Sequence, residues 1–345
     1  MIRDIDTASR PRFRDIAGEA GVGTATVERV LNARGNVAPQ TVLRVIAAAR
    51  KLGYDRALPP LYHASVRIEV VLVRLDTPFY ARLNREFVAA PASADKALIL
   101  HRSILEEATP EAIAARIRQA AAERAGLIVV VQDHPAIVAA LRACDARGLP
   151  VVLLVSDVQY GGRAIYVGID NESAGRTAGF FMRHLLGGRS GRVLTLCHGG
   201  GYLVHRQRLI GFSQYFPDPD DRLAHGCCLM GRDADDLSCA VVREALKADA
   251  GIVGLYNAGG GNDGVDRALR ESGRAGDVVF IGHEVSPGSR AALAAGRMML
   301  AIDQAPELQV RRAIEIMEAL LGLRPAPPDR SPIGFRVVTP ENLGP

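Results

Sequence analysis

The spacing of apolar residues along the chain changes near residue 65, and the first pattern is helical. Between Phe13 and Asp55, apolar positions recur every three or four residues, which predicts three short helices. Gly21-Val22-Gly23 breaks this pattern, so the turn between the first two helices is expected to be tight. The expected helices are approximately Arg14–Ala20, Thr24–Asn32 and Pro39–Leu52. The arrangement is typical of a helix-turn-helix, whose second helix enters the DNA major groove N-terminus first.

From Val66 onward, short apolar runs alternate with amphipathic helical stretches. The runs expected as strands are Ile68–Val73, Ala97–Leu100, Leu127–Val131, Val151–Val155, Val193–Cys197, Ile252–Tyr256, Val278–Ile281, Met299–Ile302 and Phe335–Val338. The expected helices include Pro110–Glu123, Ala136–Arg147, Glu172–Leu186, Gln207–Tyr215, Asp235–Ala248 and Asp263–Ser272. Such alternation predicts parallel sheets with helices on both faces, and about 280 residues are too many for one sheet. We therefore expect an α/β core of two similar lobes with a cleft between them.

Composition narrows the class of protein. Of the 345 residues, 48% are hydrophobic, which is enough for sizeable cores, yet no apolar run is long enough to span a membrane. The N-terminal segment MIRDIDTASRPRFRD lacks the apolar stretch of a secretory signal. The five cysteines are scattered, without metal-ligand spacing, and suit a reducing compartment better than a disulfide framework. We expect a cytoplasmic, nucleoid-associated protein with no membrane contact.

The net charge of +4 is confined to one end of the chain. Residues 1–63 hold ten of the 42 Lys and Arg residues and six of the 38 Asp and Glu residues, which leaves 32 of each sign in the remainder. The surplus of four positive charges thus lies on the helical segment alone. This is the distribution expected if only that segment meets phosphates, although the excess is modest.

One set of residues is more specific than a generic helix-turn-helix. Its members are Asp15-Ile16-Ala17, Ala20-Gly21-Val22, Ala25-Thr26-Val27, Arg29-Val30-Leu31-Asn32 and Leu52-Gly53-Tyr54. They resemble the headpiece of the lac repressor type (LacI/GalR) family of bacterial transcription regulators. The resemblance implies a DNA-binding headpiece at residues 13–55, preceded by a flexible arm at 1–12 and followed by a linker or hinge at 56–65.

The resemblance also implies which residues touch DNA. Thr24 and Ala25 fall on base-contacting positions at the start of the second helix, and their short side chains suit methyl or single hydrogen-bond contacts. Arg29 is expected to contact a guanine or a phosphate, and Thr26 a phosphate. The expected DNA-binding set is Thr24, Ala25, Thr26, Arg29, Asn32 and Leu61.

Two headpiece positions depart from the family pattern. Gly23 replaces the Ser that usually caps the second helix, at a cost of a few tenths of a kcal/mol. Glu28 stands where a small polar residue is usual, although an acid near phosphates should repel them. It pairs with Arg29, with Arg34 or with a cytosine amine, and the sequence does not distinguish these partners.

The linker departs further. In the family this segment folds into a hinge helix on DNA and wedges a Leu into the minor groove. The wedge position falls on His63 here, with Leu58, Leu61 and Tyr62 as the neighbouring apolar groups. Pro59-Pro60 can begin a helix but cannot lie inside one. The usual hinge mechanism is therefore not predicted by this sequence.

The core resembles the periplasmic sugar-binding fold that these regulators carry. In that fold the chain crosses between the lobes three times, and the crossings are expected near Tyr160–Ala164, Glu284–Ser289 and Leu323–Pro328. The ligand-binding core at 66–345 then divides into lobe 1, at about 66–160 and 288–323, and lobe 2, at about 164–284 and 328–345.

Polar side chains follow most of the strand runs, and ligands of open α/β sheets bind beyond the carboxyl ends of strands. Carboxylates, amides and an arginine bind hydroxyl groups in pairs, while Phe79 and Tyr80 can stack on the apolar face of a sugar. The resemblance points to the same region. The expected ligand-binding set is Asp76, Phe79, Tyr80, Asp157, Arg206, Asn257, Glu284 and Gln304, with Asp133 as an alternative to Asp157. We expect a sugar, a polyol or a sugar derivative as the effector. A phosphorylated sugar stays open because Arg206, Arg208 and His205 lie together.

Enzyme and metal hypotheses find less support. His198-Gly199-Gly200-Gly201 resembles the oxyanion-hole glycines of lipases, but the chain has no Gly-x-Ser-x-Gly elbow. Gly259-Gly260-Gly261-Asn262-Asp263-Gly264 matches the dinucleotide-binding pattern, with Glu284 about 20 residues on. The match lies deep in the second lobe rather than opening a nucleotide domain. The histidines lack consistent ligand spacing, so neither a metal nor a cofactor is expected.

The sequence therefore predicts a ligand-responsive transcription regulator, most simply a repressor, and not an enzyme. A homodimer would place two headpieces on a palindromic operator, and a small effector would close the core. Two alternatives stay open: a cytoplasmic sugar-binding module without DNA binding, and a dinucleotide-binding enzyme. The sequence does not tell the effector, the operator, or whether the effector induces or corepresses.

Overall fold

The computed structural model describes residues 11–32, 34, 37, 39–54, 66–90, 98–105, 109–217, 222–324 and 329–343. Most of the expected arm and the linker with Pro59-Pro60, Leu61 and His63 lie outside these residues. So does part of the third expected crossing, at 325–328.

Three helices form the N-terminal headpiece: α1 (Phe13–Ala20), α2 (Thr24–Leu31) and α3 (Pro39–Lys51). Their apolar faces meet in a small core, and its largest buried side chains are Ile16, Val27 and Ile46. Gly21 has φ 62° and ends α1, so the chain reverses there at no steric cost. The three predicted helices are confirmed to within one residue at each end for α1 and α2.

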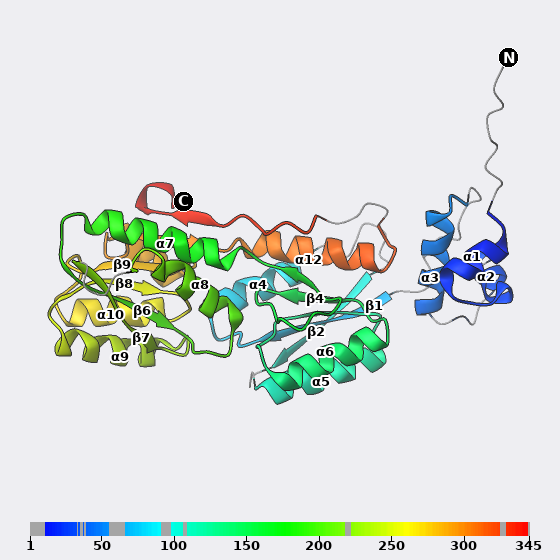
Figure 1. Cartoon of the computed structure of the whole chain (residues 1–345), viewed down its shortest axis with the longest axis horizontal. Helices are drawn as coiled ribbons and strands as arrows, with labels where there is room; N and C mark the ends of the chain where they lie inside the picture. The colour runs from blue at the N-terminus through cyan, green and yellow to red at the C-terminus, as the bar shows by residue number, and fades with distance from the viewer. Residues whose placement is uncertain are drawn as a thin grey trace, which may run out of the picture.

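The first lobe is built on a five-stranded parallel sheet in the order β2-β1-β3-β4-β5. Its strands are β1 (Val66–Val73), β2 (Leu98–Leu105), β3 (Gly126–Val129), β4 (Val151–Leu154) and β5 (Ile165–Val167). Its helices are α4 (Pro78–Ala89), α5 (Pro110–Glu123), α6 (Pro135–Ala146) and α12 (Pro306–Leu320). In Figure 1, α5 and α6 lie together on one side of the sheet and α4 with α12 on the other. Strands β3 and β4 are buried throughout because helices cover both faces.

The second lobe carries a six-stranded sheet in the order β11-β10-β9-β8-β6-β7, parallel except for β11. Its strands are β6 (Gly191–Cys197), β7 (Leu223–Met230), β8 (Ile252–Asn257), β9 (Val279–His283), β10 (Leu300–Asp303) and β11 (Arg336–Val338). Its helices are α7 (Asn171–Leu186), α8 (Leu203–Ser213), α9 (Asp235–Ala248), α10 (Asn262–Glu271) and α11 (Pro287–Ala294), and a 3-10 turn, η2 (Pro340–Asn342), follows β11. Helices α7 and α8 pack together on one face, and α9 and α10 on the other (Figure 1). The two-lobed α/β fold predicted from the alternation is confirmed.

The sheets correct the expected lobe boundaries. Strand β5 pairs with β4, so the chain leaves the first lobe at residues 168–170 rather than at Tyr160–Ala164. Strand β10 pairs with β9, so the return to the first lobe falls at Gln304–Ala305 rather than at Glu284–Ser289. The stretch from about 288 to 303 therefore belongs to lobe 2 and not to lobe 1. The alternation of apolar runs and helices in the sequence is the same for both lobes. Only the backbone hydrogen bonds between strands decide which sheet a strand joins.

Two strands were absent from the expected runs. Strand β5 has only three residues, and β7 interrupts its apolar residues with His225 and Gly226 at the edge of its sheet. Within the part of the chain that the structure describes, no helix combines the length and the apolar character needed to cross a membrane.

Candidate functional site: a polar cleft between the lobes

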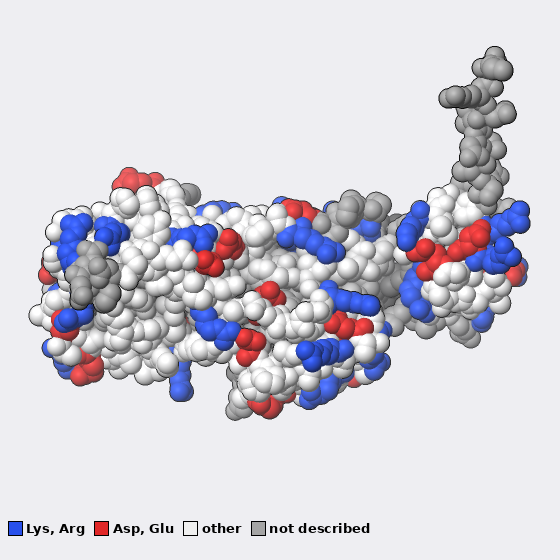
Figure 2. Space-filling view, viewed as in Figure 1, with Lys and Arg blue, Asp and Glu red and all other residues white. Residues whose placement is uncertain are grey.

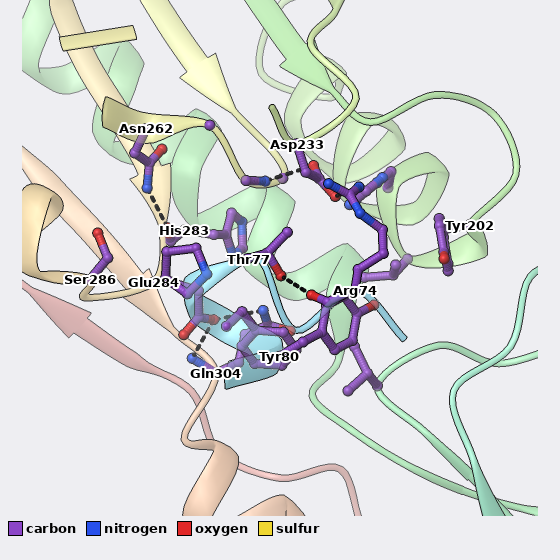
Figure 3. A pocket seen from close by; sticks show the side chains of 18 of the residues that line it. Arg74, Thr77, Tyr80, Tyr202, Asp233, Asn262, His283, Glu284, Ser286 and Gln304 are labelled. Carbon is purple, nitrogen blue, oxygen red and sulfur yellow. Dashed lines mark hydrogen bonds and ion pairs between the residues drawn. The ribbon is translucent and has the colours of Figure 1, made fainter. Parts of the chain in front are cut away.

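A cavity of about 90 Å³ opens where the carboxyl ends of strands from both sheets meet. One water needs roughly 10–15 Å³ on this scale, so the cavity holds on the order of six to nine waters. Arg74, Thr77 and Tyr80 reach it from the first lobe, and Tyr202 and Asp233 from the second (Figure 3). The position agrees with the rule that open α/β sheets bind ligands beyond their strand ends.

Strained backbone gathers around this cavity. The non-glycine residues with positive φ among the described residues lie at its lining or next to it: Arg74, Val155, Arg232, Asp233, Glu284 and Ala305. Each left-handed non-glycine residue costs on the order of 1–3 kcal/mol, and such residues cluster at functional sites. The strain therefore marks the cleft independently of its side chains.

Glu284, directly after β9, is the most strongly perturbed acid of the cleft. Arg82 of α4 donates hydrogen bonds to Glu284 Oε2 at 3.0 Å and to Asp303 Oδ2 at 2.5 Å. The Gln304 side-chain amide donates to Glu284 Oε1 at 2.6 Å. Burial, reinforced by the nearby Asp303 carboxylate, raises the pKa of Glu284 to about 8, although Arg82 opposes the shift. Near neutral pH this carboxyl is therefore largely protonated.

A pH dependence of stability follows from Glu284. Because its folded-state pKa lies above its ordinary value of 4.5, the stabilisation is complete below pH 4.5 and is lost as pH rises through about 8. Glu284→Gln cannot titrate, so its melting temperature minus that of the wild type should increase from pH 5 to about pH 8 and level off above that pH. The pKa values of His205 and His283 are lowered, so these residues change stability in the opposite direction at acid pH. Both proteins contain them, so the difference in melting temperature between Glu284→Gln and the wild type reports on Glu284.

Glu307→Gln is the matched control, since Glu307 Oε2 lies 3.9 Å from Arg82 with a side chain that is 30% exposed. The melting temperature of Glu307→Gln should depend on pH in the same way as that of the wild type. A difference between Glu284→Gln and the wild type that stays constant across this range would contradict the assignment.

Arg208 of α8 lies at the base of the cavity, with only 2% of its surface exposed. Its guanidinium donates to Asn171 Oδ1 at 3.0 Å, to the Ala258 carbonyl at 2.8 Å and to Gln304 Oε1 at 2.6 Å. All three acceptors are uncharged oxygens from α7, the end of β8 and the second crossing. Burial lowers the pKa of Arg208. The arrangement holds a desolvated cation rigidly, with its charge unneutralised by these partners.

Two histidines in the cavity wall are neutral. Burial lowers the pKa of His205 to about 4, and it lowers that of His283 well below the ordinary value. The Tyr256 hydroxyl lies 2.8 Å from His283 Nε2 and fixes that ring. Neutral imidazoles act as donors and acceptors for hydroxyl groups without adding charge.

The glycine loop before α10 is packed against the second lobe and does not present a free phosphate cradle. The Gly260 amide donates to Asp233 Oδ1 at 2.8 Å, and Asn257 Nδ2 donates to the Gly260 carbonyl at 2.8 Å. A Cβ on Gly264 would lie 1.9 Å from the Asp235 carbonyl, so this glycine allows α9 and α10 to approach. The carboxylate at the loop amide would repel a pyrophosphate, which disfavours the dinucleotide hypothesis.

Two further ion pairs join the lobes beside the cavity, in addition to the Arg82–Asp303 pair described above. Arg74, after β1, lies 3.7 Å from Asp233 and donates to the Arg232 carbonyl at 2.9 Å. Arg206 of α8 pairs with Asp133, after β3, and donates to the Gly200 carbonyl at 3.0 Å. These contacts hold the lobes together in the described conformation.

The structure brings together five of the eight predicted ligand-binding residues: Asp76, Phe79, Tyr80, Glu284 and Gln304 line the cavity. Asn257 is buried behind the glycine loop, where it supports the lining. Arg206 and Asp157 are outside the lining. Arg208, two residues after Arg206 on α8, provides the buried guanidinium instead, because its side chain faces the lobe interior while that of Arg206 is 42% exposed.

Sequence reasoning missed several lining residues. Arg74, Tyr202 and Asp233 lie in loops that follow strands, and Asn262 is the first residue of α10. Only the packing of both sheets brings these residues to one cavity. The signal that pointed to them was weak. Arg74 directly follows β1, and Asp233 follows β7, a strand that the sequence did not predict.

The exposed face of α2 is the candidate DNA interface. Thr24, Ala25 and Arg29 are exposed, and so is Asn32 directly after the helix, while Thr26 is half-buried. Gly23 occupies the N-cap without a side-chain hydrogen bond, as its replacement of Ser implies. Arg29 Nε donates to the Ala25 carbonyl at 3.3 Å.

Glu28 remains without an assigned role. It is exposed, and among the described residues it forms no ion pair with Arg29 or Arg34. Figure 2 shows both signs of charge on the visible face of the headpiece, so that face is not uniformly basic.

Comparison with known proteins gives two family matches. The model of bacterial regulatory proteins of the lacI family matches residues 12–57, and that of a periplasmic binding protein domain matches residues 68–324. Among curated proteins, an uncharacterised helix-turn-helix-type transcriptional regulator in the aml 5′ region of Streptomyces limosus is 28% identical over 206 residues, which is 59% of this chain and 57% of that protein. The ribose operon repressor of Bacillus subtilis is 43% identical over 76 residues, which is 21% of this chain and 23% of that protein. The chain thus matches little more than half the length of the first of these relatives.

Solved structures show the fold of the core. The glucose-galactose binding protein GanP of Geobacillus stearothermophilus superimposes with a TM-score of 0.71 at 18% identity, covering 80% of this chain and 99% of that one. A periplasmic solute binding protein of Actinobacillus succinogenes with bound D-allose has a TM-score of 0.71 at 21% identity, covering 81% of this chain and 99% of that one. At such identities the likeness concerns the fold alone.

Proposed function

The chain belongs to the lacI family of bacterial regulatory proteins, with a periplasmic binding protein domain as its core, and from this premise we propose that it is a sugar-responsive transcriptional repressor. The observation that carries the proposal is the presence of both parts in one chain: an exposed α2 face on a helix-turn-helix, and a polar cavity between two lobes. The protein acts as a homodimer on a palindromic operator in the cytoplasm, where it is associated with the nucleoid. It performs no catalysis.

The DNA contacts proposed are those of α2. Thr24 and Ala25 present short side chains to base edges at the N-terminus of the helix, and Arg29 presents a guanidinium one turn further on. Thr26 and Asn32 contact the backbone at either side. Leu61 completes the set from the linker.

The proposed effector is an uncharged sugar or polyol rather than a sugar phosphate. Carboxyl groups outnumber guanidinium groups in the cavity lining, and both histidines are neutral. The acids are Asp76, Asp233, Asp235, Asp263 and Glu284, and the bases are Arg74 and Arg208. Even with Glu284 protonated, a phosphate of charge about −2 would add to a surplus of negative charge. Hydroxyl groups can instead pair with carboxylates, amides and Arg208, while Phe79, Tyr80 and Tyr202 cover the apolar face.

Effector binding regulates DNA binding only through different affinities for the two arrangements of the dimer. A tenfold change in operator affinity corresponds to about 1.4 kcal/mol of coupling. A few hydrogen bonds formed on closure supply this amount. The interlobe ion pairs Arg74–Asp233, Arg206–Asp133 and Arg82–Asp303 are contacts that closure makes or breaks.

The proposal is tested by selecting bound DNA from random duplexes with the full-length protein at moderate salt. An enriched palindrome with two half-sites is the expected result, because the headpieces of a two-fold dimer read the same sequence on opposite strands. A failure to enrich any palindrome would contradict DNA regulation and leave the alternative of a sugar-binding module.

The effector class is tested by the melting temperature of the protein with pairs of free and phosphorylated sugars. A free sugar at 100 times its Kd should add about 2.7 kcal/mol of stability, or roughly 5–10 °C. Its 6-phosphate at the same concentration should give no shift. A larger shift with the phosphate than with its parent sugar would overturn the assignment of an uncharged effector.

A further inference from the structure

Two thiols approach each other on neighbouring strands of the second lobe. Cys197 ends β6, Cys228 lies in β7, and their Sγ atoms are 3.5 Å apart. Cys228 is in register with Thr195, so Cys197 is its diagonal neighbour, two residues further along β6. The pairing of β6 and β7 shifts between Val193 and Thr195, and this irregularity brings the two side chains together.

The two sulfurs differ in access. Cys197 is 5% exposed, whereas Cys228 is exposed at the outer edge of the sheet. The hydrogen bond with Cys197 lowers the pKa of Cys228, with a further contribution from Thr195, while burial opposes the shift. The same bond and burial raise the pKa of Cys197. Cys228 is therefore the more accessible and more readily ionised sulfur, and Cys197 is the protected thiol beside it.

We propose that Cys197 and Cys228 form a peroxide-sensitive dithiol that closes into an intramolecular disulfide. The Cys228 thiolate attacks a peroxide oxygen, the O–O bond breaks, and the sulfenic acid forms as hydroxide leaves. The Cys197 sulfur then attacks the Cys228 sulfur, which releases water after proton transfer. Two thiols have lost two electrons to one peroxide, and a dithiol reductant reverses the change.

Closing the disulfide displaces the end of β7. The sulfurs must move from 3.5 Å to about 2.05 Å, and diagonal neighbours in a sheet lie far enough apart to require backbone movement. This movement also shifts the residues that follow β7, because the Gly231 amide donates a hydrogen bond to the Cys197 carbonyl at 2.9 Å. Arg232 and Asp233 follow with positive φ, and Asp233 lines the cavity. Oxidation should therefore weaken effector binding, a consequence that rests on the proposed function.

The other three cysteines serve as internal comparisons. Cys144 is buried, and burial raises its pKa to about 11, which makes it unreactive. Cys239 is on the buried face of α9. Cys227 is exposed next to Cys228 and has access to peroxide, but no sulfur contact to it is present among the described residues. Cys227→Ser is therefore the matched control for Cys228→Ser.

The test treats the full-length protein with hydrogen peroxide, blocks the free thiols and identifies tryptic peptides by mass. The expected product is a disulfide between Val193–Arg206 and Leu223–Arg232, formed in the wild type and in Cys227→Ser, and lost in Cys197→Ser and Cys228→Ser. The same link in Cys228→Ser, a Cys227–Cys228 disulfide, or oxidation of Cys228 to sulfinic acid without any link would each overturn the proposal.

A second measurement concerns the cleft. The Kd of the best sugar from the melting screen should increase at least threefold on oxidation and return after treatment with dithiothreitol, and Cys228→Ser should show no change. An unchanged Kd in protein shown by mass to be fully cross-linked would refute the link to the cleft. Because the disulfide is detected without DNA or sugar, its absence would not bear on the repressor proposal, and failure of operator selection would not bear on the disulfide.

Discussion

Arg208→Ala is expected to weaken effector binding at least 100-fold while operator binding in the absence of effector is retained. The Arg208 side chain is 2% exposed and lines the cavity. Three of its five N–H groups donate to the uncharged oxygens described above, so the other two can donate to ligand hydroxyl groups. Hydrogen bonds from a charged group contribute about 1.5–3 kcal/mol each, and a 100-fold change corresponds to about 2.8 kcal/mol. Isothermal titration with the best sugar of the melting screen measures the Kd, and a gel shift with the selected operator measures DNA binding.

Arg206→Ala is the matched control, because it removes the same group from the same helix but from a side chain that is 42% exposed and pairs with Asp133. It should change the Kd for the sugar only a few-fold. Arg208→Lys keeps the charge and loses the planar fork, so its Kd should lie between those of the wild type and the alanine variant. If Arg206→Ala lost the response and Arg208→Ala kept it, the effector site would have to be placed elsewhere.

Ile16→Ala is expected to abolish specific operator binding while leaving the core and its effector affinity unchanged. Ile16 is fully buried where α1 meets α2 and α3, and truncating such a side chain costs about 2–5 kcal/mol. A hydrophobic core as small as that of the headpiece rarely supplies more than about 3–5 kcal/mol of folding stability, so the substitution unfolds the headpiece. A loss of at least 100-fold in operator affinity in the gel shift is the expected result, with the same Kd for the sugar by titration.

The graded control is Ile16→Val, which removes one methylene at a cost of about 0.5–1.5 kcal/mol and should leave the headpiece folded. Its operator affinity should fall only a few-fold. Full operator affinity in Ile16→Ala would show that DNA is bound through another part of the chain. The Arg208 and Ile16 variants together separate the two functions, since each should lose one and retain the other.

Much of the fold was predictable because the apolar spacing is local. Helices α5 and α9 have the bounds that the sequence predicts, and the core residues Ile16, Val27 and Ile46 follow from helical periodicity alone. The glycine turn at Gly21 was predictable for the same reason. Strand β5 was missed, since three residues are too few to show a period.

The site was only partly predictable. Glu284 and Gln304 were found because they directly follow clear strand runs, and carboxyl ends of strands are where such folds bind ligands. The sequence predicted Arg206 in the ligand-binding set, whereas Arg208 lines the cavity. Both lie on α8, and side chains two residues apart on a helix face different directions. Which of the two faces the interior depends on how α8 packs on α7.

For this chain, then, local sequence decides the helices of the headpiece, the alternation of strands and helices, and the likeness of each part to a known family. Those features depend on residues within a few positions of one another, where periodicity and turn chemistry act directly. The tertiary structure decides the rest: which sheet β10 joins, where the chain crosses between lobes, and which polar groups share the cavity. Arg82 and Glu284 are 202 residues apart, and the pKa of Glu284 depends on burial that exists only when the two lobes meet.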